Sequence, residues 1–416
     1  MSSPTQLVCL ITPGHLASTP RIVKEADALV EAGYLVHVVA GRHFGPVDPL
    51  DAEILGDARW QCTRVDYRGG AGALARKILR RLARRLVVHA PFATARVAAR
   101  ASHAEALHLG AVASGLPARL FVGHCLAGLP AAALAAHSRG VPYGFDAEDF
   151  HDAETEEVLN EPAERISAHV LQSRYLPGCS HLTAAAPLIG RRYEEAYHVR
   201  PRTVLNVFPR AQAPAAPVDA DALIPGRPAR IYWFSQTVGP GRGLEAVVSI
   251  LGRMHMPTEL HLRGFPAPGY AGRLQALAVS SGMKLPIRFL PPGAPGEMGR
   301  LAAGADLGLS TEPSLPPNRD ICLTNKIFVY LLAGLPQLLS NTAAQSAFAP
   351  EIGNAAILGD LSQPEAVARQ LDEFFSDPDR VRAARAAAWE LATRRFCWDV
   401  EKDKFLDSIR ALVPLA

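Results

Sequence analysis

The chain has 416 residues, of which 49% are hydrophobic and 20% charged, and a formal net charge of +3. A chain of this length is too long to fold around one hydrophobic core, so we expect two or three domains. The small net charge gives no sign of a nucleic-acid partner. The six cysteines are scattered without metal-ligand spacing, which predicts reduced thiols and a cytoplasmic protein. We expect neither a signal peptide nor a membrane span, which takes about 20 apolar residues.

The first half of the chain alternates predicted strands and helices. We expect strands at residues 7–12, 34–40, 119–124 and 141–146, helices at residues 19–33 and 129–138, and a long helix through Ala168. Pro20 favours the first turn of its helix, and Gly33 favours the end of that helix. Strand–helix–strand units of this kind predict a parallel sheet.

The second half repeats this alternation after an Ala/Pro-rich segment at residues 211–228. We expect strands at residues 231–235, 259–263, 287–290, 306–310 and 337–340, and helices at residues 244–254, 269–281, 295–303 and 325–333. The predicted fold is α/β, with two facing Rossmann-like domains and a ligand cleft between them. We place the domains at residues 1–210 and 229–395, with residues 211–228 as the linker.

A basic segment at residues 76–100 contains eight Lys or Arg residues and no acid. Its cations recur at helical spacing next to an apolar stripe. A basic amphipathic helix can lie on an anionic membrane surface. The alternative is a solvated helix face whose arginine stems cover apolar surface.

The loop SQTVGPGRGLEAV is a candidate phosphate-binding loop. Gly239, Gly241 and Gly243 precede a predicted helix, and Arg242 lies among them. Glycines let a backbone approach a ligand closely, and free N–H groups at a helix start bind anions. The alternative is an ordinary strand-to-helix turn.

The segment LTNKIFVYLLAGLP predicts a helix that begins near Asn325 and ends at Gly334. Lys326 falls in its first turn, where the helix dipole disfavours a cation. A bound anion such as a diphosphate would explain that lysine. The alternative is a lysine that reaches solvent.

His124 and Asp146 each end a predicted strand, where ligands gather in α/β folds. His124 either contacts a ligand or is a buried structural histidine. If it contacts a ligand, we expect His124→Ala to lower the reaction rate with little change in Tm. The acids Asp146 and Glu148 could perform acid/base chemistry or cap a helix.

Five motifs occur in the order found in a known enzyme family. They are STPRIVKEADALVEAGYLVHVV, VGHCLAGLPAAALAAHSRGVPYGFDAEDF, LNVFP, SQTVGPGRGLEAV and TNKIFVYLLAGLP. With these motifs the chain resembles the glycosyltransferases built from two Rossmann-like domains (the GT-B type), particularly family 4, over almost its whole length.

The resemblance implies roles for individual residues. The donor side would include Gln236, Gly239, Arg242, Gly243, Glu312, Asn325 and Lys326. The acceptor side would include Ser18, Thr19, Arg21 and Glu148, and the catalytic residues would be His124 and Asp146. The C-terminal residues 396–416 would form a helix that packs on the first domain.

Two positions depart from the family pattern. Val329 occupies the place of a glutamate that holds the nucleotide ribose, and Gln236 occupies the place of a second basic residue. Glu312 and Asp320 are nearby acids. The departures predict rebuilt donor contacts, an unusual donor, or lost activity.

The resemblance implies transfer of a sugar from a nucleotide-diphosphate donor to a hydroxyl acceptor, with retention, without cofactor or metal. The acceptor would be a sugar or a lipid-linked molecule in polysaccharide or glycolipid synthesis, and the enzyme would be cytoplasmic or peripheral on the membrane. Two alternatives are a nucleotide-sugar epimerase of the same architecture and a catalytically degenerate nucleotide-sugar-binding protein.

Overall fold

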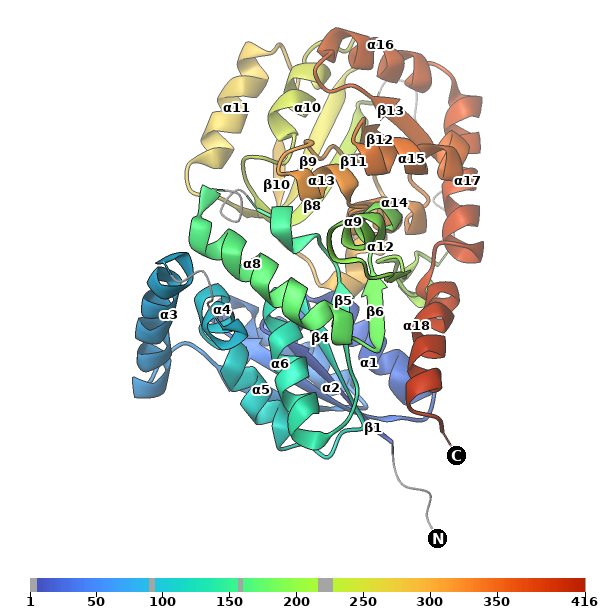
Figure 1. Cartoon of the computed structure of the whole chain (residues 1–416). Helices are drawn as coiled ribbons and strands as arrows, with labels where there is room; N and C mark the ends of the chain where they lie inside the picture. The colour runs from blue at the N-terminus through green and yellow to red at the C-terminus, as the bar shows by residue number, and fades with distance from the viewer. Residues whose placement is uncertain (1–5, 90–93, 156–159, 216–226, 416) are drawn as a thin grey trace. The chain divides into compact units, whose positions relative to one another are not determined.

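The structure is a computed structural model that describes residues 6–89, 94–155, 160–215 and 227–415 (Figure 1). The chain divides into two compact units. Unit 1 comprises residues 1–205, 316–318 and 402–416, and unit 2 comprises residues 206–315 and 319–401. Each unit is a parallel sheet flanked by helices, which confirms the predicted pair of Rossmann-like domains. That the two domains face each other across a cleft stays a prediction.

Unit 1 contains a seven-stranded sheet in the order β3-β2-β1-β4-β5-β6-β7. Its strands are β1 (Leu7–Thr12), β2 (Leu35–Arg42), β3 (Gln61–Asp66), β4 (Leu120–His124), β5 (Tyr143–Ala147), β6 (His181–Ala184) and β7 (Arg202–Thr203). The central strand β1 has a continuous apolar run because helices cover both faces of the sheet. In the register, Leu10 pairs with Val38 on one side and Val122 on the other.

The α-helices of unit 1 include α1, which follows β1, and α6, which follows β4. Their bounds are α1 (Pro20–Glu31), α2 (Asp48–Asp57), α3 (Ala71–His89), α4 (Ala95–Ser102), α5 (Ala106–Ser114), α6 (Cys125–Arg139), α8 (Pro162–Tyr175), α9 (Pro187–Tyr197) and α13 (Pro317–Ile321), which spans the unit boundary. The helix α18 (Trp398–Leu412) contributes Lys402, which pairs with Glu31 of α1 at 2.8 Å. Tyr34 also donates a hydrogen bond to the Val413 carbonyl at 2.7 Å.

Unit 2 contains a six-stranded sheet in the order β10-β9-β8-β11-β12-β13. Its strands are β8 (Ala229–Val238), β9 (Thr258–Pro266), β10 (Arg288–Leu290), β11 (Leu307–Ser310), β12 (Gln337–Ser340) and β13 (Ala356–Gly359). Its helices are α10 (Leu244–Leu251), α11 (Tyr270–Ser280), α12 (Met298–Ala302), α14 (Asn325–Leu332), α15 (Ala343–Ile352), α16 (Pro364–Phe375) and α17 (Pro378–Arg394). The core of this unit lies around Trp233, Leu262 and Leu309.

Several sequence predictions need correction. The strands β3 and β13 were not expected, because their residues are only partly buried and their apolar runs are short. The helix expected to end at Ala168 begins at Pro162 and continues to Tyr175. The basic segment forms two helices, α3 and α4. Most of the predicted linker lies outside the described residues.

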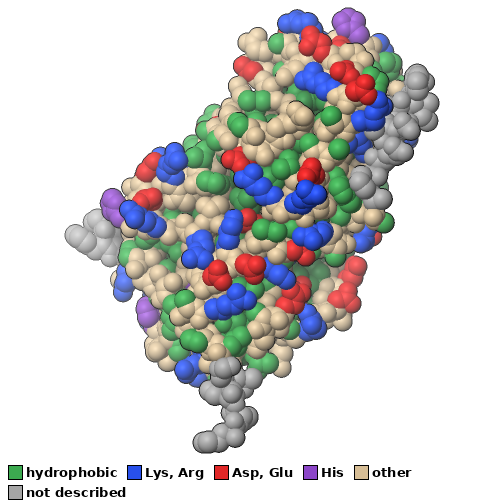
Figure 2. Space-filling view, turned by 90° about the vertical axis from the view of Figure 1, so that its right-hand side faces the viewer, with side chains coloured by type: hydrophobic (Ala, Val, Ile, Leu, Met, Phe, Trp, Pro, Cys, Tyr) green, Lys and Arg blue, Asp and Glu red, His purple; other side chains and the backbone are tan. Residues whose placement is uncertain are grey.

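Charges of both signs are interspersed on the surfaces of α17 and α18 (Figure 2). Ion pairs there include Arg394 with Glu390 at 2.6 Å, and Arg410 with Asp407 at 3.2 Å. Such mixed surfaces are typical of solvated helix faces. None of the described helices is both long enough and apolar enough to cross a membrane.

Candidate active site

Two neighbouring strands of unit 1 carry polar residues at their carboxyl ends: His124 is the last residue of β4, and Asp146 is the last but one of β5. The register of β4 and β5 places these residues side by side. Helix α1 begins after β1 and brings Arg21 to the same edge of the sheet, because the carboxyl ends of parallel strands meet there. The side chains of all three are fully buried. Cys125, which follows His124 in the chain, has a φ of 58°, an uncommon conformation for a non-glycine residue.

Arg21 and Asp146 form a bidentate ion pair. Nε of Arg21 donates to Oδ2 of Asp146 at 2.5 Å, and Nη2 donates to Oδ1 at 2.8 Å. The third nitrogen, Nη1, donates to the Val204 carbonyl at 2.7 Å. Thr183 of β6 also donates a hydrogen bond to Asp146. Such paired geometry is what permits two charges to be buried together.

His124 and Glu25 extend this network. His124 Nε2 lies 3.1 Å from Glu25 Oε2, and His124 Nδ1 lies 3.4 Å from Asp146 Oδ2. Glu25 Oε1 is also 3.4 Å from Arg21 Nε. The network therefore joins two cations and two carboxylates inside unit 1.

The pKa shifts follow from this arrangement. Burial alone would raise the pKa of Asp146, but Arg21 and His124 hold it far below its usual range. Burial alone would lower the pKa of His124, but Glu25, Asp146 and Glu148 raise it well above its usual value. Burial raises the pKa of Glu25. Burial and Arg21 lower the pKa of Lys24 to about 7.

The charge on His124 predicts a pH-dependent contribution to stability. Because its pKa is higher in the folded than in the unfolded state, its proton stabilises the fold fully below about pH 6.5. That stabilisation is lost as the pH rises through the folded pKa. Above pH 6.5 we expect the free energy of unfolding of wild type to approach that of His124→Gln. Urea unfolding of both proteins at several pH values measures this difference. A constant difference between the two proteins over this range would contradict a charged His124.

The predicted acceptor residues divide into exposed and buried ones. Ser18 is exposed, and Glu148 is partly exposed and lies 3.9 Å from His124. Thr19 is buried and donates to the His15 carbonyl at 2.7 Å. Arg21 is fully buried. Of the predicted acceptor residues, Ser18 and Glu148 therefore reach the surface.

His124 has the fully enclosed geometry of the structural alternative. Its removal takes one of the two cations away from the buried carboxylates Glu25 and Asp146, which costs stability. His124→Ala should therefore lower Tm. Sequence reasoning missed Glu25 and Thr183. The spacing of Arg21 and Glu25 by four residues in a helix was a usable signal, because such pairs face each other.

Two groups of side chains in the described part of unit 1 have the spacing of metal ligands. They are His15 with Asp48 and Asp51, and Glu25 with His124 and Asp146. Arginines already pair with both groups. Arg64 lies 2.5 Å from Asp51, and Arg21 pairs with Asp146. A transfer reaction without metal stays a prediction.

In unit 2, the glycine loop (residues 239–243 of the candidate phosphate-binding segment) passes close to the end of β11. Gly241 and Gly243 have φ of 70° and 73°, which favours glycine. A Cβ on Gly243 would lie 2.0 Å from the Thr311 carbonyl oxygen. The loop thus needs glycine both for its conformation and for its close approach. Gly239 is buried, Arg242 is half-buried, and Gln236 is exposed.

Lys326 does not reach solvent. Its Nζ donates to Glu312 Oε1 at 2.6 Å, and both side chains are nearly fully buried. Nζ also lies 5.5 Å from the ring centroid of Trp233. Burial would raise the pKa of Glu312, but Lys326 and, more weakly, Arg242 hold it below its usual value. A carboxylate partner therefore explains how a lysine is tolerated in the first turn of α14.

The remaining predicted donor-side positions lie near this pair. Asn325 is half-buried at the start of α14, and Val329 is buried one turn further along. The Asp320 carboxylate accepts the Ala343 N–H at 3.0 Å at the start of α15. Arg242 and the N–H groups at the start of α14 are chemically suited to an anion, and diphosphate binding by these groups stays a prediction.

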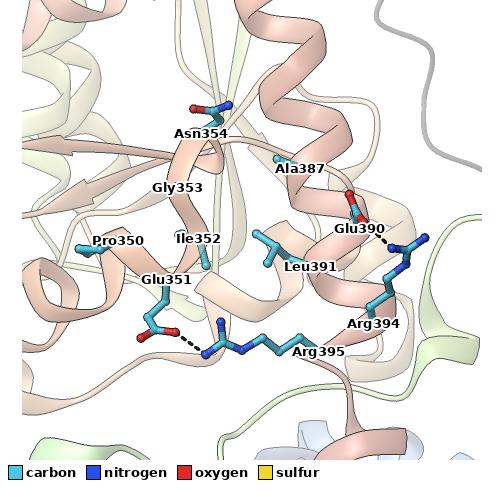
Figure 3. A pocket seen from close by; sticks show the side chains of 10 residues that line it. All are labelled: Pro350, Glu351, Ile352, Gly353, Asn354, Ala387, Glu390, Leu391, Arg394 and Arg395. Atoms are coloured by element: carbon cyan, nitrogen blue, oxygen red, sulfur yellow. Dashed lines mark hydrogen bonds and ion pairs between the residues drawn. The ribbon is translucent and has the colours of Figure 1, made fainter.

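A separate pocket of about 440 Å³ in unit 2 contains none of the predicted residues. Figure 3 shows its lining from α15, α17 and the turn between α15 and β13. Ion pairs join Glu351 to Arg395 and Glu390 to Arg394 across and beside it. Its charged side chains are paired with one another, so it offers less to an anion than the glycine loop does.

Comparison with solved structures identifies the fold. HepE from Anabaena, solved with UDP and glucose, superposes with a TM-score of 0.70 at 14% identity, over 98% of this chain and 100% of HepE. Sucrose-phosphate synthase from Thermosynechococcus elongatus superposes with a TM-score of 0.71 at 14% identity, over 98% and 99% of the two chains. This chain has the GT-B fold. The predicted resemblance to GT-B glycosyltransferases is confirmed at the level of fold.

The GT-B fold is shared by enzymes of more than one class. A Listeria monocytogenes protein described as a UDP-N-acetylglucosamine 2-epimerase superposes with a TM-score of 0.59 at 12% identity, over 98% and 97% of the chains. No protein-family model matches the chain. No curated protein matches it in sequence.

Proposed function

We propose that this GT-B protein transfers a sugar, with retention of configuration and without a metal ion, from a nucleotide-diphosphate sugar to a hydroxyl acceptor. The observation that carries the proposal is that the glycine loop, with Arg242, approaches Thr311, the neighbour of the Glu312 that pairs with Lys326 at the start of α14. In support, the similarly folded HepE was solved with UDP-glucose.

The donor diphosphate would bind at the starts of α10 and α14. Helix starts offer free N–H groups and a positive dipole end to an anion. Gly243 is the residue before α10, and its lack of a side chain lets the loop pack against the Thr311 carbonyl beside the start of that helix. Arg242 would bind the phosphate oxygens directly, and Lys326 would hold Glu312 and add positive charge nearby. These groups would stabilise the negative charge that develops on the leaving diphosphate.

Unit 1 would bind the acceptor at the carboxyl ends of β1, β4 and β5. Ser18 and Glu148 reach the surface there and would contact acceptor hydroxyls. The buried network of Arg21, Asp146 and His124 would position these strand ends, with His124 holding Glu148 through charge. In this account His124 and Asp146 are positioning residues, and catalysis rests on orienting donor and acceptor.

Arg242→Ala should weaken binding of UDP by about tenfold or more, because a charge-assisted hydrogen bond contributes roughly 1.5–3 kcal/mol. The Tm should stay unchanged, since Arg242 is partly exposed. Isothermal titration calorimetry with UDP measures the effect. The matched control is Arg382→Ala, which removes an exposed arginine from α17 of the same unit. Equal affinities in the two variants would contradict the assignment.

Two other functions give different results in the same assays. An epimerase, favoured by the Listeria structure, would convert the nucleotide sugar without an acceptor, and product analysis would show a new nucleotide sugar. A degenerate binding protein, favoured by Val329 and Gln236, would bind UDP and release none from a nucleotide sugar. Release of UDP that increases with an added acceptor supports transfer.

We further propose that the acceptor belongs to polysaccharide or glycolipid synthesis and that the enzyme works in the cytoplasm at a membrane. None of the six cysteines, all of which lie in the described residues, forms a disulfide bond, which fits a reducing compartment. A lipid-linked acceptor would be met at the membrane surface.

A further inference from the structure

Helix α3 exposes large aliphatic side chains. Leu74, Ile78, Leu82 and Leu86 are exposed by 62%, 48%, 54% and 52%. They recur every four residues and therefore form one stripe along the helix. Leu79 and Val88 widen the exposed apolar surface. A continuous apolar patch of this kind marks an interaction surface.

The side of α3 that packs on unit 1 carries smaller residues. Ala73, Ala83 and Val87 are its buried positions. At about 100° per residue, these positions lie roughly opposite the Leu/Ile stripe. The arrangement is the reverse of an ordinary surface helix, whose largest apolar residues face the core. Burial in unit 1 therefore does not account for the leucines of α3.

The cations of α3 divide into two groups. Arg76 pairs with Glu105, and Arg80 and Arg84 both pair with Glu164 of α8. These three arginines fasten α3 to unit 1.

The second group consists of Lys77, Arg81 and Arg85, which are exposed and recur every four residues beside the apolar stripe. Within the described residues they have no carboxylate partner. The exposed face of α3 thus combines apolar residues with unpaired cations, unlike the mixed charges of α17 and α18 (Figure 2).

The basic character continues beside the helix. A hollow of about 200 Å³ next to α3 is lined by Arg76, Arg100 and His108 together with Leu79. Basic groups next to an apolar surface fit the phosphates of lipid headgroups.

We propose that unit 1 docks on an anionic lipid surface through the exposed face of α3. Leu74, Ile78, Leu82 and Leu86 enter the boundary between headgroups and acyl chains, and Lys77, Arg81 and Arg85 contact lipid phosphates. A second copy of the chain is a poorer occupant, because a symmetric contact would bring like charges together. The inference goes beyond the proposed transfer, and lipid binding is measured without any sugar substrate.

Vesicle co-sedimentation tests the proposal. The full chain should bind vesicles of equal parts phosphatidylcholine and phosphatidylglycerol at low salt, and binding should fade as salt rises. It should bind pure phosphatidylcholine far less. Lys77→Gln/Arg81→Gln/Arg85→Gln should weaken binding by roughly a hundredfold, at about fivefold for each cation. Ile78→Ser/Leu82→Ser/Leu86→Ser should weaken it at every salt concentration.

The matched control is Arg380→Gln/Arg382→Gln/Arg394→Gln, which removes three exposed cations from α17 and gives the same net charge. It should bind as wild type does. Absence of binding by wild type at low salt, or equal loss in the control, would overturn the proposal. Concentration-dependent dimerisation that the serine variant abolishes, without vesicle binding, would assign the face to a second copy instead.

The two groups of α3 cations should also differ in their effect on folding. Arg80→Gln/Arg84→Gln removes two ion pairs to the largely buried Glu164 of α8 and should lower Tm. Arg81→Gln/Arg85→Gln removes the same charge from exposed positions and should leave Tm unchanged. Differential scanning calorimetry compares the two variants, and equal Tm values would contradict the division.

Discussion

Arg21→Met is expected to lower the free energy of unfolding by about 3–5 kcal/mol, because the buried Asp146 loses its bidentate partner and keeps His124 as a cation. The side chains of both partners are fully buried, and they are joined by two hydrogen bonds. The Val204 carbonyl would also lose its donor. Urea unfolding followed by circular dichroism measures the loss.

Arg200→Met is the matched control for that variant. Arg200 also pairs with a carboxylate, Glu194 at 2.7 Å, but its side chain is 87% exposed. Exposed ion pairs contribute little, so the control should unfold as wild type does. If Arg21→Met unfolded at the same urea concentration as Arg200→Met, the buried network would not stabilise unit 1.

Lys326→Met should cause a loss of similar size, about 3–5 kcal/mol, because Glu312 would remain buried without its cation. In wild type the pKa of Glu312 is below its usual value, whereas in the variant burial would raise it. A protonated Glu312 needs no cation. The loss should therefore be greatest at neutral pH and shrink as the pH falls, which unfolding at neutral and acid pH would measure.

Replacing both partners tests whether the unpaired carboxylate is the cause. Lys326→Met/Glu312→Leu should recover most of the stability, since a buried pair replaced by apolar residues of similar volume is often neutral. A double variant as unstable as Lys326→Met would show that Lys326 stabilises unit 2 by another contact. Lys326 affects stability in either case, so Arg242 is the cleaner probe of donor binding.

The sequence predicted the α/β fold because its main signals are local. Each signal occupies only a few consecutive residues. Examples are the apolar runs of β1 and β12, the helix start at Pro20 and the helix end at Gly334. Parallel pairing followed from the alternation of strands and helices. The strands β3 and β13 were missed because their partly exposed residues lack that apolar run.

The side-chain environments could not be predicted in the same way. Arg21 and Asp146 are 125 positions apart, and their pairing depends on where α1 and β5 meet in the folded unit. Likewise, Glu312 partners Lys326 only because β11 and α14 adjoin. The sequence identified strand-end residues as candidates, and it could not show that His124 is enclosed and Glu148 partly exposed.

Hydrogen–deuterium exchange with a bound nucleoside diphosphate tests the central claim most directly. We would use whichever of UDP, GDP and ADP raises Tm most, since a ligand specific for the folded state stabilises it. The account predicts protection at residues 239–247 and 324–329, around Arg242 and Lys326, and little change around the pocket of residues 350–354. Failure of all three diphosphates to raise Tm, or protection at residues 350–354 and 387–395 instead, would contradict it.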